Sequence, residues 1–172
     1  MSDVLPGLAG NPSLPRELVD RLIATADGEL AEALAERPDL ARAQVVALAA
    51  RDEGAALQLA YGGRLTAADV DPVARPFVAL ALLEEGAGPS EWTRLLAGTG
   101  SPEQRERLAG CPGLPEDVAR ALAADPEIGV VAELALWTTS GLLARLAEHP
   151  HAEVRRAVAA PLPCLFPWAT RG

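Results

Sequence analysis

The chain has 172 residues, enough for one ordinary domain or a short repeat array, and 49% of them are hydrophobic but only 3% aromatic. Its 24 acidic residues and 15 arginines give a formal net charge of −9, and it contains no lysine. This charge argues against nucleic acid and anionic membranes as main partners, because both attract basic surfaces, and it fits cationic or neutral partners better.

Apolar residues recur at three- to four-residue spacing in the first third of the chain, for example at Leu18 and Leu22 and at Leu30 and Leu34. This spacing is typical of amphipathic helices. It predicts helices over 15–25, 28–37, 40–51 and 53–61. Since no segment alternates as a strand does, the predicted fold class is all-α.

The pattern breaks after Tyr61, where two glycines open an irregular segment with one short turn of helix after Thr66. Pro76 then starts a helix, PFVALALLEE, that is apolar on nearly every side. A helix without a polar face is usually wholly buried, so we expect this one to be the mechanical centre of the fold. Gly86 to Pro89 ends it, and Ser90 to Leu96 begins a more regular half.

The stretch from Ser101 onward consists of three lines of 24 residues, each with proline in its second position. A fixed period of this kind is the signature of a repeat architecture, in which each unit buries its apolar face against its neighbours. The residues before the prolines, Ser101, Asp125 and His149, form a column of predicted helix N-caps, and His149 is the weakest of them.

The same repeat relates the two halves of the chain. Residues 8–35, LAGNPSLPRELVDRLIATADGELAEALA, match residues 108–135, LAGCPGLPEDVARALAADPEIGVVAELA, at ten of 28 positions. In each half a turn, NPSLP or CPGLP, stops one helix, and its second proline is expected to open the next helix as its first residue.

The 24-residue period, the Asp-Pro and His-Pro helix starts, the two turns and HAEVRRAVAA at 151–160 resemble the leucine-rich repeat variant family of bacterial proteins. The resemblance covers 8–37 and 101–161. It implies a HEAT-like solenoid in which short helices, some of them 3₁₀, alternate with α-helices in a right-handed superhelix. It implies no activity, because solenoids host many binding roles. Some family members carry an N-terminal iron–sulfur segment, but this chain has no cysteine cluster near its start, so no cofactor is expected.

The last line departs from the family pattern and ends in PLPCLFPWATRG, whose prolines forbid regular pairing. One interpretation is a cap over the end of the array, since solenoid ends otherwise expose core. The other is a docking tail for a partner or for a second copy of the chain in a homodimer, with Phe166 and Trp168 as contacts. Deletion of 162–172 distinguishes a cap, whose loss lowers the melting temperature, from a docking tail, whose loss abolishes association.

Two charged clusters lie near this end of the chain. His149 and His151 have two nearby glutamates but no third strong ligand, and the proline between them turns them along different directions, so no metal site is predicted. Arg155 matches an arginine of the family pattern that looks structural, and we expect it to reach Asp125 or Glu127 of the preceding unit. The alternative for Arg155 and Arg156 is an anion contact on the concave face.

Tryptophan is enriched in binding hot spots, but it also fills gaps in an alanine-rich core. Trp92, Trp137 and Trp168 are therefore candidate contacts. Trp137 stands where the aligned line has the turn residue Gly113, so we expect it at a helix junction and partly exposed.

Paired carboxylates fall at expected helix ends, where acidic residues are ordinary, and Glu84 and Glu85 are kept as candidate contacts for a cationic partner. No nucleophile elbow, cysteine–histidine pair or phosphate loop is recognisable, so the protein is not expected to be an enzyme. Cys111 and Cys164 lack metal-type spacing and are expected to be small buried residues. Neither a secretory signal nor an apolar run of membrane length is recognisable, so a cytoplasmic protein is expected.

The exclusive use of arginine has two explanations that the sequence leaves open. Arginine is suited to bidentate recognition, and a GC-rich genome would also favour arginine together with alanine, glycine and proline. Residues 1–86 carry 14 acidic and 7 basic groups, whereas residues 87–172 carry 10 and 8. A charged partner is therefore expected nearer the N-terminal half.

We predict a single α-solenoid domain over 1–172 with about six to seven repeats. Its parts are N-terminal repeats (1–61), an irregular break with the buried central helix (62–92), regular repeats (93–161) and a cap or tail (162–172). The predicted function is a non-catalytic binding module or scaffold with a concave groove for a protein or peptide.

Two alternatives remain. The first is capture of a small metabolite by a self-resistance or biosynthetic accessory protein, with Phe77, Trp92 or Trp137 lining a pocket. The second is a HEAT-like DNA-base enzyme, which the negative charge disfavours. A peptide binder should present an open, polar and acidic groove, whereas a metabolite binder should enclose an apolar cavity of several hundred cubic ångströms.

Overall fold

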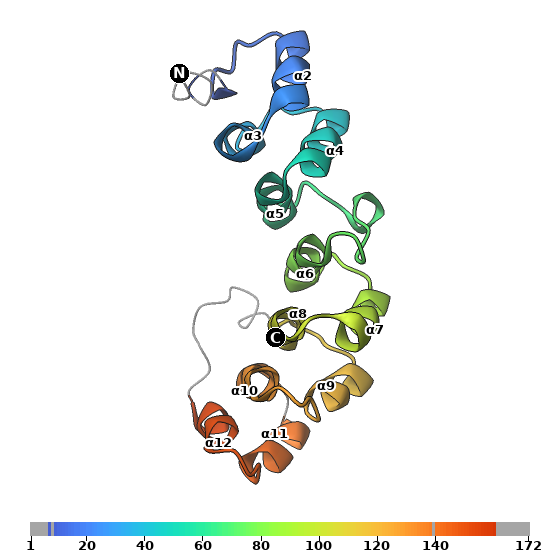
Figure 1. The fold of residues 1–172 in the computed structure, drawn as a ribbon, viewed down its shortest axis with the longest axis vertical. Coiled ribbons are helices and arrows are strands. Elements are labelled where there is room, and N and C mark those ends of the chain that lie inside the picture. The colour runs from blue at the N-terminus through green and yellow to red at the C-terminus, as the bar shows by residue number, and fades with distance from the viewer. Residues whose placement is uncertain (1–6, 8, 139, 161–172) are drawn as a thin grey trace. The chain divides into compact units, whose positions relative to one another are not determined.

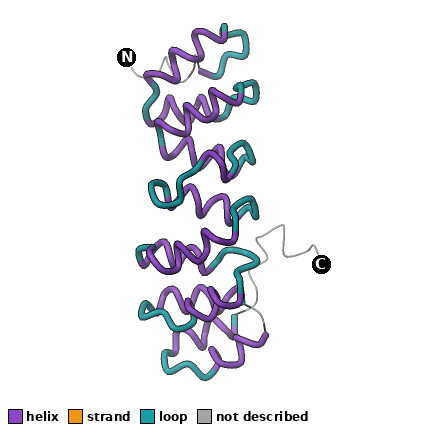
Figure 2. Tube along the Cα trace, turned by 90° about the vertical axis from the view of Figure 1, so that its right-hand side faces the viewer, coloured by secondary structure: helices purple, strands orange, loops and turns teal. Residues whose placement is uncertain are grey.

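The computed structural model describes residues 7, 9–138 and 140–160. Within these residues the chain forms eleven α-helices and one short 3₁₀ helix, and none of them lies in a strand (Figure 2). The all-α prediction is therefore confirmed. The chain divides into two compact units, unit 1 (Met1–Gly88) and unit 2 (Pro89–Gly172).

The helices of unit 1 follow the predicted ranges closely. They are α2 (Arg16–Thr25), α3 (Gly28–Ala35), α4 (Arg42–Arg51), α5 (Glu53–Tyr61), the 3₁₀ helix η1 (Ala67–Asp69) and α6 (Pro76–Glu84). Within this unit α5 packs against both α3 and α6, and α2 packs against α4, so alternate helices share a layer (Figure 1). The two layers meet where α4 contacts α3 and α5.

The apolar helix α6 is buried, as its composition predicts. Its first residue is Pro76, and the six residues from Val78 to Leu83 are at most 6% exposed. Since six consecutive residues cover every side of an α-helix, this burial explains the lack of a polar face. In the structure α6 is the last helix of unit 1.

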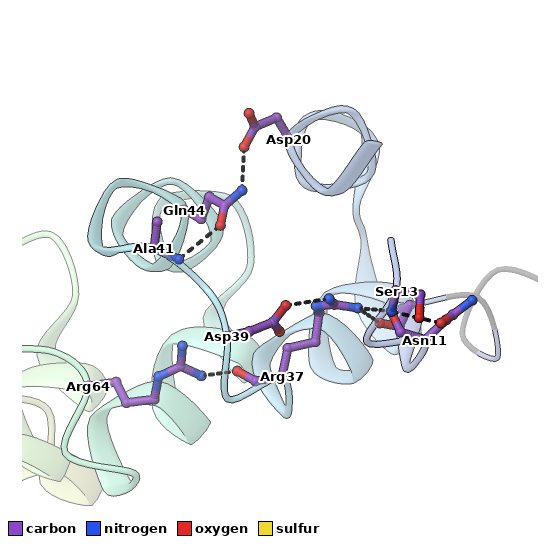
Figure 3. A network of polar contacts seen from close by, with 9 residues as sticks. Asn11, Ser13, Asp20, Arg37, Asp39, Ala41, Gln44 and Arg64 are labelled. Atoms are coloured by element: carbon purple, nitrogen blue, oxygen red, sulfur yellow. Dashed lines mark hydrogen bonds and ion pairs between the residues drawn. The ribbon is translucent and has the colours of Figure 1, made fainter. Parts of the chain in front are cut away.

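Arginine side chains connect successive helices of unit 1 through backbone carbonyl groups (Figure 3). The Arg37 side chain is 2% exposed, and its Nη1 donates to the carbonyl oxygens of Ala9 at 2.6 Å and Asn11 at 2.7 Å. Its Nη2 donates to Asp39 Oδ2 at 2.7 Å. Arg64 Nη1 in turn donates to the carbonyl oxygen of Arg37 at 2.6 Å. Carbonyls near helix ends lack an intrahelical donor, and the guanidinium group supplies one.

A second row of arginines makes the same kind of contact. Arg51 Nε donates to the carbonyl oxygen of Ala26 at 3.2 Å, and Arg75 donates to the carbonyl oxygens of Ala49 and Ala50. In both rows the donor follows its acceptor by 25 to 29 residues, about one repeat. These arginines thus donate to backbone carbonyls inside the fold, and Arg75 does so with both of its terminal nitrogens.

Unit 2 contains six described helices. They are α7 (Ser90–Thr99), α8 (Pro102–Ala109), α9 (Glu116–Leu122), α10 (Ile128–Trp137), α11 (Ser140–Ala147) and α12 (Ala152–Ala159). Here α10 packs against both α8 and α12, while α7 contacts α8 and α9 (Figure 1). Val131, Ala135, Leu146 and Val154 form a buried cluster that joins α10, α11 and α12.

The predicted helix starts are confirmed in part. Ser101 is the N-cap of α8, its Oγ accepts from the Gln104 N–H at 3.3 Å, and Gln104 Oε1 accepts from the Ser101 N–H at 2.9 Å. This is the predicted capping box. Pro15 and Pro115, expected as first helical residues, are instead the N-cap residues of α2 and α9.

Asp125 and His149 are not N-caps, and that prediction is wrong by two residues. Asp125 Oδ1 accepts from the N–H of Glu127 at 2.9 Å, and Glu127 is the N-cap of α10. His149 Nδ1 likewise accepts from the N–H of His151, the N-cap of α12. Both side chains close a short turn before the helix, because they bond to the backbone two residues ahead rather than three.

The predicted pairing of Arg155 with Asp125 or Glu127 is also wrong. Arg155 Nη1 donates to the carbonyl oxygens of His149 at 2.6 Å and Pro150 at 2.7 Å. Asp125 is held instead by Arg105, whose Nε and Nη2 donate to its two carboxylate oxygens at 2.6 and 3.0 Å. Arg105 lies closer because α8 packs against α10, at whose start Asp125 stands.

Candidate binding site

A pocket of about 580 Å³ lies in unit 2 between the end of α8, the turn to α9, the end of α10 and the start of α11. It is larger than three pockets of unit 1, whose volumes are about 400, 300 and 200 Å³. Ligand sites in proteins typically have volumes of about 300–1,000 Å³. The pocket of unit 2, called the α8–α11 pocket below, is therefore large enough for a small molecule or for a side chain and its neighbours.

Helix-breaking residues create the walls of this pocket. The turn CPGLP separates α8 from α9, and Gly113 within it has φ +67°, a left-handed conformation that favours glycine. On the opposite side α10 ends at Trp137, and Thr138 leaves the helix with extended backbone. Helix ends and turns thus surround the pocket.

The α8–α11 pocket has a buried apolar floor and an exposed rim. Ala109, Cys111 and Leu134 are at most 4% exposed and form the floor. The rim residues Glu116, Arg120 and Arg145 are exposed. The pocket is therefore open to solvent on one side and is neither a sealed cavity nor a flat surface.

Trp137 is the aromatic residue of this pocket. It is the last residue of α10 and is half-buried, as expected for a helix junction. Its Nε1 donates to Glu133 Oε1 at 2.8 Å, which sets the orientation of the indole ring. A Cβ at Gly110 would lie 3.0 Å from Glu133 Oε1 and 3.6 Å from Trp137 Nε1, so the glycine allows both side chains to lie against the end of α8.

The charges of the pocket lie on its rim. Arg120 pairs with Glu116 one helical turn away, and both side chains are more than half exposed, so their interaction contributes little to stability. Arg145 has no ion-pair partner in the described part of the chain. The lining thus holds two arginines and one glutamate, a net charge of +1.

The internal repeat allows the residues at this junction to be compared between the two units. The spacing of 100 residues that relates the two halves places Trp137 at the position of Arg37, and Ala109 and Cys111 at those of Ala9 and Asn11. Arg37 lies beyond the end of α3, where its buried side chain donates to backbone carbonyls, whereas Trp137 is the last residue of α10 and lines the pocket.

The connection between helices also differs. Residues 36–41 join α3 to α4 and include the buried Leu40, whereas only residues 138–139 join α10 to α11. The connection in unit 2 is thus four residues shorter.

The other candidate residues do not gather at the α8–α11 pocket. Trp92 is half-buried on α7, and Phe77 is half-buried on α6 of unit 1. Glu84 at the end of α6 accepts a hydrogen bond from Tyr61 Oη at 2.5 Å, and Glu85 beside it is exposed.

At the C-terminal side, Arg155 and Arg156 are exposed on α12 and do not line the pocket. Phe166 and Trp168, and with them the proposed cap or docking tail, lie outside the described residues. Of the predicted contacts that the structure describes, Trp137 is the one that lines this pocket.

Among the described residues, no three histidine, cysteine or acidic side chains come together as a metal site. The rings of His149 and His151 stand 5.6 Å apart, centroid to centroid. Cys111 is buried as predicted, at 4% exposure, whereas Cys164 lies outside the described residues. No described helix combines the length and the apolar character needed to cross a bilayer.

Sequence reasoning missed most of the pocket lining, including Cys111, Arg120 and Arg145. The one signal near it is that Trp137, two residues beyond the aligned segments, stands 100 residues after Arg37. Comparison with protein-family models, with curated proteins and with solved structures finds no match for this chain.

Proposed function

We propose that this protein is a non-catalytic binding module that holds a segment of a protein or peptide partner in the α8–α11 pocket. The proposal includes the finer architecture that the repeats suggest, a right-handed solenoid of the leucine-rich repeat variant kind with about six to seven repeats. The observation that carries it is a pocket of about 580 Å³ lined by the half-buried Trp137.

The shape of the pocket supports a peptide partner. Its rim is exposed on two helices, at Glu116 and Arg120 of α9 and at Arg145 of α11. A chain that continues past a bound side chain can leave across this rim, whereas a sealed cavity would require the whole ligand to fit inside. Tryptophan at such a site supplies a large apolar contact with little loss of conformational entropy.

The chemistry of the lining supports binding rather than acid–base catalysis. Cys111 Sγ donates to the carbonyl oxygen of Arg107 at 3.7 Å, and Glu116 is paired with Arg120. No histidine is among the described residues that line this pocket, so none of them offers an imidazole to activate the cysteine as a nucleophile.

Selection from a random peptide library displayed on phage, with the full chain immobilised, tests the proposal. We expect enriched peptides to bind the unaltered protein and the Trp92→Ala variant with similar affinity. Trp137→Ala should weaken binding about tenfold or more, because hot-spot aromatics contribute at least about 1.4 kcal/mol. Fluorescence anisotropy of labelled peptides gives the affinities.

Trp92→Ala is the matched control, since both tryptophans are half-buried helix residues of unit 2 but only Trp137 lines the pocket. Equal losses in the two variants would indicate a general effect on stability. Enriched peptides that bind Trp137→Ala as tightly as the unaltered protein would refute the proposal.

A second candidate function, capture of a small metabolite, is favoured by the volume of the pocket and its buried floor. A library of small aromatic compounds screened by thermal shift tests it with the same pair of variants. Stabilisation that Trp137→Ala abolishes and Trp92→Ala retains would support this second candidate.

A further inference from the structure

We propose that two copies of this chain associate through helix α2 of unit 1, which pairs antiparallel with the α2 of a second copy. The inference is independent of the α8–α11 pocket, because that pocket lies in the other compact unit. It rests on an apolar face of α2 that is left exposed, and on two exposed side chains of opposite charge beside this face.

The apolar face of α2 lies on the side of the helix that is turned away from α4. On the α4 side, Gln44 Nε2 donates to Asp20 Oδ1 at 2.6 Å (Figure 3). Successive residues of an α-helix are rotated by about 100°, so Leu18 and Leu22 each stand about 160° around the helix from Asp20. Leu18 is 40% exposed and Leu22 is half-buried. These two leucines therefore point away from α4.

Leu18, Leu22 and Thr25 form one continuous stripe, since their spacing is that of a single helix face. Thr25 Oγ1 donates to two carbonyl oxygens of the preceding turn, at 3.2 and 3.3 Å. Its hydroxyl group is thus satisfied within the helix and does not oppose burial of this face. Val19 and Ile23, on another side of α2, are each 4% exposed and belong to the core. The stripe is therefore a second apolar surface of the same helix.

Two opposite charges lie along one edge of the stripe. Glu17 and Arg21 are exposed, and neither forms an ion pair within the part of the chain that the structure describes. In an antiparallel pair of α2 helices centred on Val19, the Glu17 of each copy lies level with the Arg21 of the other, because both are two residues from the centre. The same arrangement brings the leucines of the two copies together. The charges of α2 are thus complementary to those of a second α2.

Unit 2 shows how a face of this kind is covered within the fold. Helix α9 begins directly after an N-cap proline, as α2 does, so the second, third and seventh residues of the two helices correspond. Helix α7 packs against α9, and Arg94 of α7 donates to both carboxylate oxygens of Asp117 at 2.7 and 3.1 Å. Val118 and Leu122 of α9 are only 3% and 1% exposed. In the proposed dimer, Arg21 of the second copy takes the role that Arg94 has here.

The net charge of the chain limits the strength of this association. Each copy carries −9, so two copies repel each other at long range. At physiological salt the Debye length is about 8 Å, which leaves the contacts across the helix pair to decide the outcome. Since one short helix from each copy forms the interface, we expect a weak, reversible dimer rather than an obligate one.

Sedimentation equilibrium of the full chain tests the inference. At physiological salt and at protein concentrations up to about 500 μM, we expect a monomer–dimer equilibrium. Leu18→Ser should weaken the association about tenfold or more, because the two-fold symmetry removes two apolar side chains from the interface at once. Val46→Ser is the matched control, since Val46 is 36% exposed on α4, outside the proposed interface, and it should leave the association unchanged.

Charge reversals test the antiparallel pairing directly. Glu17→Arg and Arg21→Glu each place like charges opposite one another twice, so each variant alone should associate about tenfold more weakly than the unaltered protein. An equimolar mixture of the two variants should restore the association, because each copy then meets opposite charges. Arg16→Glu changes the charge as much as Arg21→Glu does, but it lies about 160° around the helix from Leu18 and should have little effect.

Three results would overturn the inference. The first is a chain that stays monomeric over this concentration range. The second is a dimer that the single charge reversals leave intact, since another surface would then hold it. The third is a mixture of the two variants that associates no better than its components. Melting temperatures of all variants show whether lost association comes from unfolding. Peptide binding at the α8–α11 pocket is measured separately, so failure of the dimer leaves the proposed function standing.

Discussion

Among single residues, the arginines of unit 1 have a clear structural role: they donate hydrogen bonds to carbonyl oxygens near helix ends, as C-cap groups do. Arg37 and Arg64 each donate to two carbonyl oxygens near a helix end about one repeat earlier in the chain. The guanidinium plane suits two acceptors at once, and it is more weakly hydrated than an ammonium group, so its burial is less costly. Replacement by lysine is therefore not conservative at these positions.

Arg37→Lys should lower the free energy of unfolding by about 2 kcal/mol, since a buried side chain loses at least two of its three charge-assisted hydrogen bonds. The matched control is Arg120→Lys, whose parent side chain is 57% exposed and forms one i,i+4 pair. Its effect should stay below about 0.5 kcal/mol. Urea denaturation followed by circular dichroism measures both, and equal losses would rule out the role given to Arg37.

The pair of Arg105 and Asp125 makes stability depend on pH. The hydrogen bonds from Arg105 hold the pKa of Asp125 below its ordinary value of 3.8, and they outweigh the effect of burial, which raises it. The folded state therefore binds the proton less readily than the unfolded state. The contribution of this carboxylate to stability is complete above the ordinary pKa and is lost as the pH falls through the lower, folded-state value.

We therefore expect Asp125→Asn to be less stable than the unaltered protein at pH 7, with a gap that narrows as the pH falls below 3.8. Melting temperatures measured in steps from pH 7 to about pH 3 give the comparison. Glu103→Gln, at an exposed position of α8, is the control. A gap that stays constant over this range would show that the charge of Asp125 does not stabilise the fold.

At the scale of elements, turns rather than helix propensity set the boundaries of the short helices. Gly113 stops the chain between α8 and α9 with φ +67°, and it faces open space, so a side chain there would meet strain but no clash. Gly98 lies inside α7, also with open space around it, and its backbone is helical. Because a Cβ would meet open space at both glycines, a difference between substitutions at the two positions reports the effect of backbone conformation alone.

Gly113→Ala should lower the free energy of unfolding by about 1–2 kcal/mol, the cost of placing a Cβ in the left-handed region. Gly98→Ala should raise it by about 0.5–1 kcal/mol, because alanine has the higher helix propensity. Denaturant titration of the two variants measures the opposite signs. A loss in both variants would indicate that neither site is as open as the structure shows.

At the scale of the molecule, each helix contacts its neighbours within a compact unit. In unit 2, for example, α10 packs against α8 and α12, and in unit 1 α5 packs against α3 and α6. Proteins that consist of such neighbour contacts unfold in parts when one part is weakened. Substitutions in one unit should therefore act mainly on that unit.

Leu34→Ala, at a fully buried position of α3, should lower local stability by about 2–5 kcal/mol. Hydrogen exchange monitored by mass spectrometry should then rise in peptides of unit 1 more than in those of unit 2. Val131→Ala in the buried cluster of α10 is the reciprocal variant and should give the opposite pattern. A uniform rise throughout the chain in both variants would show that the two units unfold together.

The errors of sequence interpretation have a common cause. Asp125 and His149 were predicted as N-caps because their residue types and positions suit a cap, but the same residue types also close turns just before a helix. The choice between the two depends on where the following helix packs. Arg155 was assigned a distant carboxylate for a similar reason, since charge alone does not show which acceptor lies within reach.

The sequence by itself determined the all-helical class, the helices of unit 1 and the buried character of α6. These features follow from spacing and composition over a few residues, which a local pattern records directly. Trp137 at a helix junction belongs to the same group, because the aligned repeat marks that position as a turn.

Only the tertiary structure decided which residues meet. The carbonyl partners of Arg37 lie 26 and 28 residues before it, and the lining of the α8–α11 pocket comes from four helices and the turns between them. Such contacts depend on how helices pack and on the length of a connection, as between α10 and α11, and no short pattern records either. Trp137 of this pocket and the buried Arg37 stand 100 residues apart in the repeat, yet their surroundings differ, because different side chains and helix ends pack around them.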